Sequence, residues 1–223
     1  MQTVYFVDFD HTISRQDVWD YIVKTYASHV WEDLVSKYIN GELTSRQCNQ
    51  RVAQELVMPE EIARREILDI GIDPAFPAFA DWTRENNLPM SIVSDGYDYY
   101  IDLMLKEANL DWIPSFSNKM VWKGDRVDVA FPWSRATCER DMANCKCQHI
   151  EKAEGKRRVY VGDGISDACA APKCEVVYAK LGLLDHCVKH GVEHVAFDSF
   201  AEILEREQAW FESQTQDPQS ILQ

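Results

Sequence analysis

Residues 4–10 read VYFVDFD, a short apolar run that ends directly in two carboxylates, Asp8 and Asp10. A continuous apolar run of this length is typical of a strand that is buried on both faces of a parallel sheet. Open α/β sheets bind their ligands outside the carboxyl ends of such strands. The opening stretch therefore predicts a parallel α/β fold with Asp8 and Asp10 at its ligand-binding edge.

Four later stretches also have the character of buried strands: residues 90–93, 158–161, 176–179 and 194–197. Segments with helical spacing separate them, and this alternation predicts a parallel sheet with helices on both faces. The first of the four ends at Ser94. The second ends at Asp163, and Asp167 follows four residues later. Polar side chains from three strand ends are thus expected to meet at one edge of the sheet.

Two segments interrupt the alternation. Residues 16–80 carry apolar side chains at one-face helical intervals, and we expect a small helical cap there, inserted after the first strand. Residues 119–129 predict a β-hairpin insertion around the turn Lys123-Gly124-Asp125. The expected domains are a core of residues 1–15 and 81–214, a cap of residues 16–80, and a disordered tail of residues 215–223.

The composition is that of a globular protein with a strong acidic excess. Of the 223 residues, 46% are hydrophobic and 27% are charged, and the formal net charge is −14. This charge excludes nucleic acid as an expected partner, and no run reaches the ~18 apolar residues of a membrane span. The N-terminus lacks the features of a signal peptide, so we expect a cytoplasmic location. A site for a phosphorylated metabolite must be locally positive, which a bound cation and a lysine would provide.

The Asp8-Phe9-Asp10 pattern suits a metal site. Side chains alternate along an extended segment, so the two carboxylates lie on the same side. Together with Asp163 they could bind a hard cation, which prefers oxygen ligands. An isolated Asp-x-Asp is more often a solvated turn. Here its place after an apolar strand, with further carboxylates at another strand end, favours the metal site.

Four features occur in order along the chain: DFDHT at residues 8–12, Ser94, Lys146, and GDGISD at residues 162–167. In this order they resemble the motifs of the haloacid dehalogenase (HAD) superfamily of phosphatases. The resemblance implies a HAD-like Rossmannoid fold and a phosphoric monoester hydrolase that uses Mg²⁺. Its partner would be a small phosphorylated metabolite, and the protein would be a monomer or homodimer. The helical insertion resembles the cap of the phosphoserine phosphatase branch.

The resemblance also implies a role for each matching carboxylate. Asp8 would attack phosphorus and form an aspartyl phosphate, which splits one difficult displacement into two steps. Asp10 would protonate the leaving alcohol and then activate the hydrolytic water. The metal would be held by Asp8, by the backbone carbonyl of Asp10 and by Asp163. Asp167 would support this set of metal ligands.

The phosphoryl oxygens would be bound by Ser94, by Lys146 and by the backbone N–H groups near Asp95 and Gly96. Lys156 competes with Lys146 for this role. It directly precedes a predicted strand, however, and should lie at the opposite end of the sheet. Lys146 begins the helix before that strand, which places it at the catalytic end.

Within the cap, Asp17 lies where the insertion begins and Arg51 lies on a predicted helix. In the phosphoserine phosphatase branch, an acidic residue and an arginine at such places bind the amino and carboxylate groups of the substrate. The alternative for both residues is a solvated helix face.

A closer resemblance is to the methionine-salvage 2-hydroxy-3-keto-5-methylthiopentenyl-1-phosphate phosphatase subfamily. It rests on residues 94–100, on the predicted hairpin, and on Thr137-Cys138 followed eight residues later by Lys146. His11 stands where that subfamily usually has a glycine. Three tyrosines that directly follow Ser94 are candidates for lining the substrate entrance: Tyr97, Tyr99 and Tyr100.

The chain contains seven cysteines, an odd number that favours reduced thiols over a disulfide framework. Cys138, Cys145 and Cys147 crowd into ten residues. With His149 they could form a Zn²⁺ site, since thiolates and imidazole suit tetrahedral zinc. Reduced cysteines without a metal are the alternative, as is a redox switch beside the catalytic lysine.

Other functions remain open at this level. Within the same fold, the chain could be a phosphoserine phosphatase, a HAD phosphotransferase or a dehalogenase. Dehalogenation is disfavoured because Asp10 supplies the acid that a phosphoester leaving group needs. A non-catalytic zinc-binding protein of HAD fold is the alternative from another class.

Overall fold

The computed structural model describes residues 2–138 and 140–215. Within these residues, seven strands form one sheet in the order β4-β3-β2-β1-β5-β6-β7. The strands are β1 (Thr3–Val7), β2 (Met90–Tyr97), β3 (Ser115–Lys123), β4 (Arg126–Ala130), β5 (Arg157–Gly162), β6 (Val176–Ala179) and β7 (Val195–Ala196). All neighbours are parallel except β3 and β4. The expected parallel α/β sheet is confirmed.

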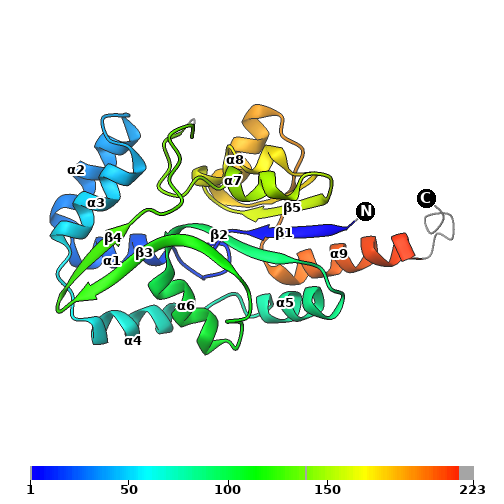
Figure 1. The fold of residues 1–223 in the computed structure, drawn as a ribbon, viewed down its shortest axis with the longest axis horizontal. Coiled ribbons are helices and arrows are strands. Elements are labelled where there is room, and N and C mark those ends of the chain that lie inside the picture. The colour runs from blue at the N-terminus through cyan, green and yellow to red at the C-terminus, as the bar shows by residue number, and fades with distance from the viewer. Residues whose placement is uncertain (1, 139, 216–223) are drawn as a thin grey trace.

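Helices cover both faces of the sheet (Figure 1). One face carries α5 (Phe76–Glu85), α6 (Asp98–Glu107) and α9 (Phe200–Thr215), and the other carries α7 (Cys147–Ile150) and α8 (Leu181–His190). Single 3₁₀ turns lie at Glu151–Ala153, Ile165–Asp167 and Ala171–Lys173.

The central strand β1 shows why both faces need cover. Its side chains alternate between the faces, as the two-residue period of a strand requires. Tyr5 and Val7 belong to one buried apolar cluster, whereas Val4 and Phe6 belong to a second one on the opposite face. The apolar run in the sequence is therefore continuous because both faces of the strand are buried.

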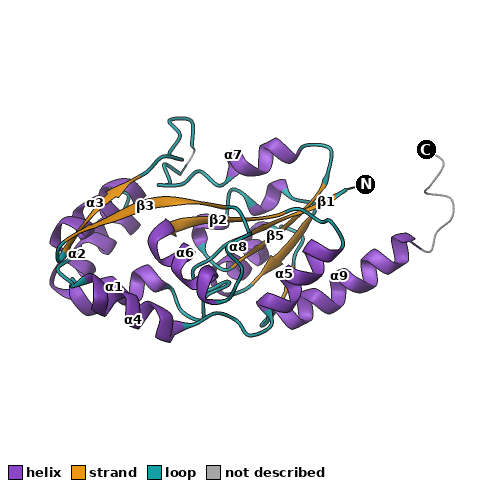
Figure 2. Cartoon of the chain, turned by 60° about the horizontal axis from the view of Figure 1, so that its bottom comes forward, coloured by secondary structure: helices purple, strands orange, loops and turns teal. Residues whose placement is uncertain are grey.

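Four helices follow β1 and cover one end of the molecule (Figure 2). They are α1 (Val18–Tyr26), α2 (Ser28–Ile39), α3 (Ser45–Glu55) and α4 (Glu60–Ile70). Thr44 begins α3 with a capping box, in which its side chain and that of Gln47 each accept from the other's backbone N–H. We call these four helices the cap. The predicted cap boundary at residue 80 falls inside α5, which packs against α9.

The predicted hairpin is present, with Gly124 in the left-handed conformation at its turn (φ 71°). It is not a free-standing insertion, however, because the first half of β3 pairs with β2 and only the second half pairs with β4. The hairpin also reaches the cap. Met58 N–H donates to the Asp125 carbonyl (2.8 Å), and Arg126 donates to the Gln54 carbonyl (2.9 Å). The sheet edge thus supports α3.

In the part of the chain that is described, no helix is long and apolar enough to cross a membrane. The predicted tail, residues 215–223, begins at the last residue of α9. Its remaining residues, 216–223, lie outside the described residues.

Candidate active site

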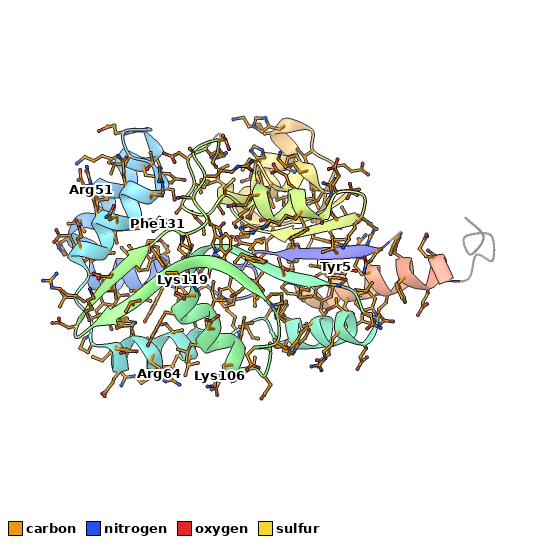
Figure 3. The ribbon with its side chains drawn as sticks, in the orientation of Figure 1. Tyr5, Arg51, Arg64, Lys106, Lys119 and Phe131 are labelled. Carbon is orange, nitrogen blue, oxygen red and sulfur yellow. The ribbon has the colours of Figure 1, made fainter. Side chains whose placement is uncertain are left out.

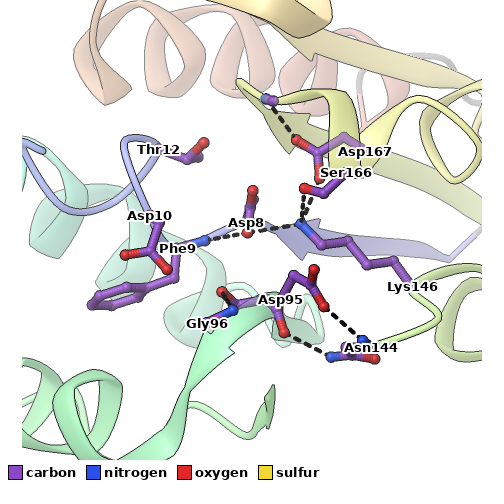
Figure 4. A network of polar contacts seen from close by, with 12 residues as sticks. Asp8, Phe9, Asp10, Thr12, Asp95, Gly96, Asn144, Lys146, Ser166 and Asp167 are labelled. Atoms are coloured by element: carbon purple, nitrogen blue, oxygen red, sulfur yellow. Dashed lines mark hydrogen bonds and ion pairs between the residues drawn. The ribbon is translucent and has the colours of Figure 1, made fainter. Parts of the chain in front are cut away.

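The polar strand ends meet, as the topology requires. Strands β2, β1 and β5 are neighbours, and Val7 is in register with Ile92 on one side and Val161 on the other. The residues just beyond these positions therefore lie at one edge. Figure 4 shows the result, with Asp8 between the Lys146 ammonium and the loop that carries Asp10.

Asp8 is 4% exposed and points into this edge. Its Oδ1 accepts from the Phe9 backbone N–H (2.7 Å) and from Lys146 Nζ (2.8 Å). Among the described residues, none donates to Oδ2, so one carboxylate oxygen remains free for a ligand. Burial and the charge of Asp167 raise the pKa of Asp8, and the Lys146 ammonium opposes them.

Lys146 is fully buried between carboxylates. Its Nζ donates to Asp167 Oδ1 (2.5 Å) and to Ser166 Oγ (3.2 Å) in addition to Asp8. Burial alone would lower the pKa of Lys146, but the charges of Asp167 and Asp8 outweigh it and raise the pKa. The lysine therefore stays an ammonium, and it is the local positive charge that this acidic protein needs for a phosphate.

Asp167 is the most fully hydrogen-bonded group of the site. Besides Lys146, it accepts from Tyr160 Oη (2.6 Å) and from the backbone N–H groups of Asp163 (3.1 Å) and Gly164 (3.0 Å). A carboxylate with this many donors has little capacity left for a metal. This geometry suits the supporting role that the resemblance implies for Asp167: it fixes the lysine and the loop after β5.

Asp163 faces Asp8 from the end of β5. Thr12 Oγ1 donates to its Oδ1 (3.2 Å) from the loop after β1. That loop holds His11 at φ 57°, a left-handed conformation that suits the glycine usual at this position. Burial and the charge of Asp167 raise the pKa of Asp163 to about 7. A carboxylate held this close to others favours a cation beside it.

One cluster of metal-ligating side chains is found among residues 2–138 and 140–215. One carboxylate oxygen from each of Asp8, Asp163 and Asp167 lies within 4.8 Å of the others. Oxygen-only ligands suit a hard divalent cation. The carboxylate of Asp10 lies outside the cluster, so only its backbone carbonyl remains available for the role that the resemblance implies.

The Asp10 carboxylate lines the cavity above Asp8. Its Oδ1 accepts from the backbone N–H of Val18, the first residue of α1, and its Oδ2 accepts from Tyr100 Oη (2.9 and 2.6 Å). Burial and the charge of Asp17 raise the pKa of Asp10, while these two hydrogen bonds oppose the rise. A raised pKa suits a carboxyl group that must carry a proton at its working pH.

Ser94 Oγ accepts from the Gly96 N–H (3.0 Å), which leaves the hydroxyl hydrogen free to donate to a ligand. The Asp95 side chain has a different role from that of a phosphate ligand. It is turned toward Asn144, Ser45 and Asn118, and accepts from each. Only the backbone N–H of Asp95 can therefore bind an anion. Its carboxylate instead joins the cap to β2.

The predicted zinc residues lie elsewhere. Cys145 and Cys147 are buried in an apolar cluster. The His149 ring stacks on Phe116, with centroids 4.6 Å apart. Its Nε2 donates to Asn144 Oδ1 (3.1 Å), because the Asn144 amide already donates to two carbonyls.

These residues and Cys138 do not form a metal cluster within the described chain. All seven cysteines are free thiols. The described residues thus give the zinc alternative no support, because the four groups are not brought together as one set of ligands. Two of the thiols, Cys138 and Cys145, do lie close enough to interact. Burial lowers the pKa of His149 to about 4, so its ring is neutral.

A cavity of about 260 Å³ lies between the cap and the strand ends. Asp17 lines this cavity. It is also the N-cap residue of α1, where its side chain accepts a hydrogen bond from the Asp20 N–H. Arg51 does not line it, because its side chain is exposed on α3 (Figure 3). The cap residues that do face the cavity include Trp19, Trp31, Val35, Tyr38, Ser45, Asn49 and Val52.

Sequence reasoning did not predict the roles of three buried residues of the site: Tyr100, Tyr160 and Asn144. Tyr100 was expected at the substrate entrance, but it is fully buried and holds Asp10. Tyr160 stood two residues before Gly162 in an apolar run, and nothing in that pattern marks its hydroxyl as polar support for Asp167.

Residues 3–181 match the model of a protein family described as "Putative Phosphatase". The chain belongs to this phosphatase family. The matched residues include all the strands that deliver Asp8, Ser94 and Asp163. The chain is therefore a phosphatase, as the resemblance inferred from the motifs implied.

Two relatives and one solved structure are similar to this phosphatase over most of its length. A polyol phosphate phosphatase of Saccharomyces cerevisiae is 30% identical over 230 residues, covering 92% of each protein. A 2-hydroxy-3-keto-5-methylthiopentenyl-1-phosphate phosphatase of Brevibacillus brevis is 26% identical over 212 residues, covering 90% of this chain and 93% of that protein. A phosphoserine phosphatase, solved as a phospho-aspartyl intermediate analogue, has a TM-score of 0.69 at 19% identity, over 92% of this chain and 98% of that one. This last likeness confirms the HAD-like fold.

Proposed function

We propose that this phosphatase is Mg²⁺-dependent, that it forms a phosphoaspartate on Asp8, and that it acts on monoesters whose alcohol carries no charge. One observation carries the mechanism: Asp8 keeps a free carboxylate oxygen while a buried ammonium, Lys146, holds the other. A nucleophile fixed in this way is oriented before its substrate binds. The ammonium also offsets the repulsion between the carboxylate and an anionic phosphate.

In the first half-reaction, Asp8 Oδ2 forms a bond to phosphorus as the bond from phosphorus to the ester oxygen breaks. Lys146 and the free hydroxyl hydrogen of Ser94 stabilise the charge on the phosphoryl oxygens. Asp10, which faces the same cavity, gives its proton to the departing alkoxide. The products of this step are the free alcohol and an acyl phosphate on Asp8.

In the second half-reaction, Asp10 is ionised and takes a proton from water, whose oxygen attacks the same phosphorus. The bond to Asp8 breaks, so inorganic phosphate leaves and both carboxyl groups return to their starting states. The same position of Asp10 serves both steps, because the water enters where the alcohol left.

Asp8 and Asp163 are the side chains that would hold Mg²⁺, and the backbone carbonyl of Asp10 would complete the protein ligands. When bound, the ion supplies charge that offsets the phosphate and the clustered carboxylates. Supporting evidence lies in the donor set, which consists of oxygen alone, and in the raised pKa values of Asp8 and Asp163.

The substrate class follows from the cavity wall. The described residues that line the cavity include neither lysine nor arginine, and Arg51 lies outside it. A second anionic group on the substrate, such as the carboxylate of phosphoserine, would therefore be buried beside Asp17 and Asp95 without a partner. That arrangement costs several kcal/mol on the usual scale for an unpaired buried charge, about 3–5.

Uncharged alcohols avoid this cost. Tryptophan rings offer an apolar wall, while Asn49 and Tyr38 offer hydrogen bonds to hydroxyl or keto groups. Both named substrates of the relatives, polyol phosphates and the methylthiopentenyl phosphate, lack a second charged group. We favour polyol phosphates, because the relative with that name has the higher identity of the two described.

A matched pair of substrates tests the proposal. Glycerol 3-phosphate and 3-phosphoglycerate differ only at the carbon farthest from the phosphate, which is a hydroxymethyl group in the first and a carboxylate in the second. With Mg²⁺ present, we expect kcat/KM to be at least about tenfold higher for glycerol 3-phosphate, equivalent to 1.4 kcal/mol. Equal or faster hydrolysis of 3-phosphoglycerate would overturn the assignment to an uncharged alcohol. Phosphate release unaffected by EDTA would overturn the metal assignment.

A further inference from the structure

The general acid of the proposed mechanism is held on both sides. The backbone N–H of Val18 fixes Asp10 Oδ1 from the first residue of cap helix α1. The hydroxyl of Tyr100 fixes Oδ2 from the first turn of α6, at 2.6 Å. Since the two oxygens have separate donors, rotation of the carboxylate about its Cβ–Cγ bond would break both hydrogen bonds. Each oxygen still keeps a lone pair for a proton in transit.

Tyr100 is built for this contact rather than for the core alone. Its ring is fully buried between Phe9 and Tyr97, with centroid distances of 6.1 and 6.3 Å. Phenylalanine would fill the same volume. The hydroxyl group is therefore not explained by packing, and within the described residues Asp10 is its hydrogen-bond acceptor.

Gly96 provides independent support. A Cβ atom placed on Gly96 would lie 2.0 Å from Tyr100 Oη and 2.2 Å from Asp10 Oδ2. Such distances are impossible for non-bonded heavy atoms, so the hydroxyl and the carboxylate occupy space that only glycine leaves open. The sequence between Ser94 and Tyr97 thus makes room for this one hydrogen bond.

We propose that Tyr100 is the positioning residue for the general acid, and that its hydroxyl holds the Asp10 carboxyl group where it meets the leaving oxygen. This inference rests on the proposed role of Asp10. Proton transfer needs the two oxygens within about 2.6–3.2 Å, so a carboxyl group that rotates freely spends less time in reach. Through Asp10, the contact also links α6 to the first residue of the cap helix α1.

The identity of the leaving group reports on this role directly. An alkoxide is a strong base and leaves slowly without a proton, whereas 4-nitrophenolate is stable enough to leave unprotonated. A misplaced acid must therefore slow the first half-reaction of alkyl phosphates selectively, whereas hydrolysis of the phosphoenzyme is the same step for both esters. A defect in phosphate binding, in the nucleophile or in folding slows both kinds of substrate alike.

The experiment compares kcat/KM for glycerol 3-phosphate and 4-nitrophenyl phosphate in Tyr100→Phe and wild type, with Mg²⁺ saturating. This ratio reports the first half-reaction only, so the later role of Asp10 in hydrolysing the phosphoenzyme does not enter it. General acid catalysis is worth about 10²–10⁴-fold, and part of this remains when the acid is only loosened. We expect kcat/KM for the alkyl ester to fall by about 10- to 100-fold and kcat/KM for the aryl ester by less than about threefold. Equal losses on both esters, or no loss on the alkyl ester, would overturn the proposal.

Tyr160→Phe is the matched control. This residue is also a buried tyrosine, and its hydroxyl also donates to a carboxylate at 2.6 Å, but that carboxylate is Asp167. Because Asp167 holds Lys146, we expect similar fold-losses on the two esters. Selective loss on the alkyl ester in this variant would mean that the readout does not isolate the acid, and the proposal would then fail.

Two further variants separate the possible failures. Asp10→Asn removes the acid itself and should show the same selectivity to a larger degree. If it does not, the proposed role of Asp10 fails. If it does while Tyr100→Phe is unselective, only the inference about Tyr100 fails. Gly96→Ala places a Cβ against both the Tyr100 hydroxyl and the Asp10 carboxylate, so selective loss is expected there too. Its absence in a folded Gly96→Ala protein counts against the proposal.

Discussion

Two buried carboxylate networks lie in this molecule, and they differ in whether their hydrogen-bonding capacity is used up. The first surrounds Glu207 on α9. Each of its oxygens accepts from the Arg157 guanidinium (2.7 and 2.9 Å), and Tyr5 and Tyr178 add one hydroxyl donor each (2.7 and 2.8 Å). One carboxylate and one guanidinium balance in charge, and Glu207 is 1% exposed.

The second network lies at the carboxyl ends of the strands and combines the same kinds of group. The Asp167 carboxylate accepts hydrogen bonds from several donors, among them Tyr160 and Lys146. Asp8 and Asp163, however, share the Lys146 ammonium with Asp167, and burial raises the pKa of both. The negative charge exceeds the positive charge here, and carboxylate oxygens remain without donors.

This difference indicates which buried charges stabilise the fold and which are available to bind a ligand. A buried ion pair with all its hydrogen bonds made is costly to break, because breaking it leaves an unpaired charge. A buried site with excess charge is unfavourable until a ligand arrives, and such strained electrostatics cluster at functional sites. The predictions below separate activity from stability along this line.

The largest effect is expected for Asp8→Asn. The amide keeps the shape of the side chain but cannot attack phosphorus, so we expect turnover to fall by at least about 10⁴-fold, the scale typical of a lost covalent nucleophile. Thermal unfolding should occur at the wild-type temperature or above it, since one of the repelling carboxylates is gone. Turnover within tenfold of wild type would exclude the phosphoaspartate mechanism.

A smaller effect, on stability alone, is expected for Glu207→Gln. The substitution leaves the Arg157 guanidinium buried without a carboxylate, and breaking such a pair costs about 3–5 kcal/mol. Denaturant titration measures the free energy of unfolding, and kcat of the folded fraction should match wild type. Glu175→Gln is the control, because its pair with Arg158 is on the surface and is worth about 0–1 kcal/mol. Equal losses in the two variants would contradict the comparison.

Much of the second network could be predicted from sequence because its members stand at strand ends. Asp8, Ser94 and Asp163 follow apolar runs directly, and the parallel topology then brings them together. Lys146 was placed by the helix that it begins. These inferences need only the order of elements, which local patterns report well.

The residues that the sequence did not reveal depend on helix phase and on distant partners. Arg51 is two residues after Asn49, about 200° around the helix, so it points away when Asn49 faces the cavity. Tyr100 and Asp10 are 90 positions apart, and no local pattern links them. The first network was missed for the same reason, since Glu207 is 202 positions from Tyr5.

A third effect, the pH dependence of metal-free stability, tests the comparison at Asp163. In the folded protein the pKa of Asp163 is raised to about 7, whereas the ordinary value is 3.8. Between pH 4 and pH 7 the folded state therefore binds a proton that the unfolded chain has released. The free energy of unfolding must fall as pH rises through this window, and the stability is fully present only below it.

A divalent cation should remove this loss, because it favours the ionised carboxylate. At 100 times its Kd, Mg²⁺ would add about 2.7 kcal/mol to the folded state. We expect the rise in Tm on adding Mg²⁺ to be larger at pH 7.5 than at pH 5, measured against samples in EDTA. Asp163→Asn should reduce both the rise itself and its pH dependence, while Glu207→Gln should keep both at a lower starting Tm. A rise that is equal at both pH values would mean that Asp163 does not bind the ion. The carboxylate of Asp163 would then be no more available to a ligand than that of Glu207.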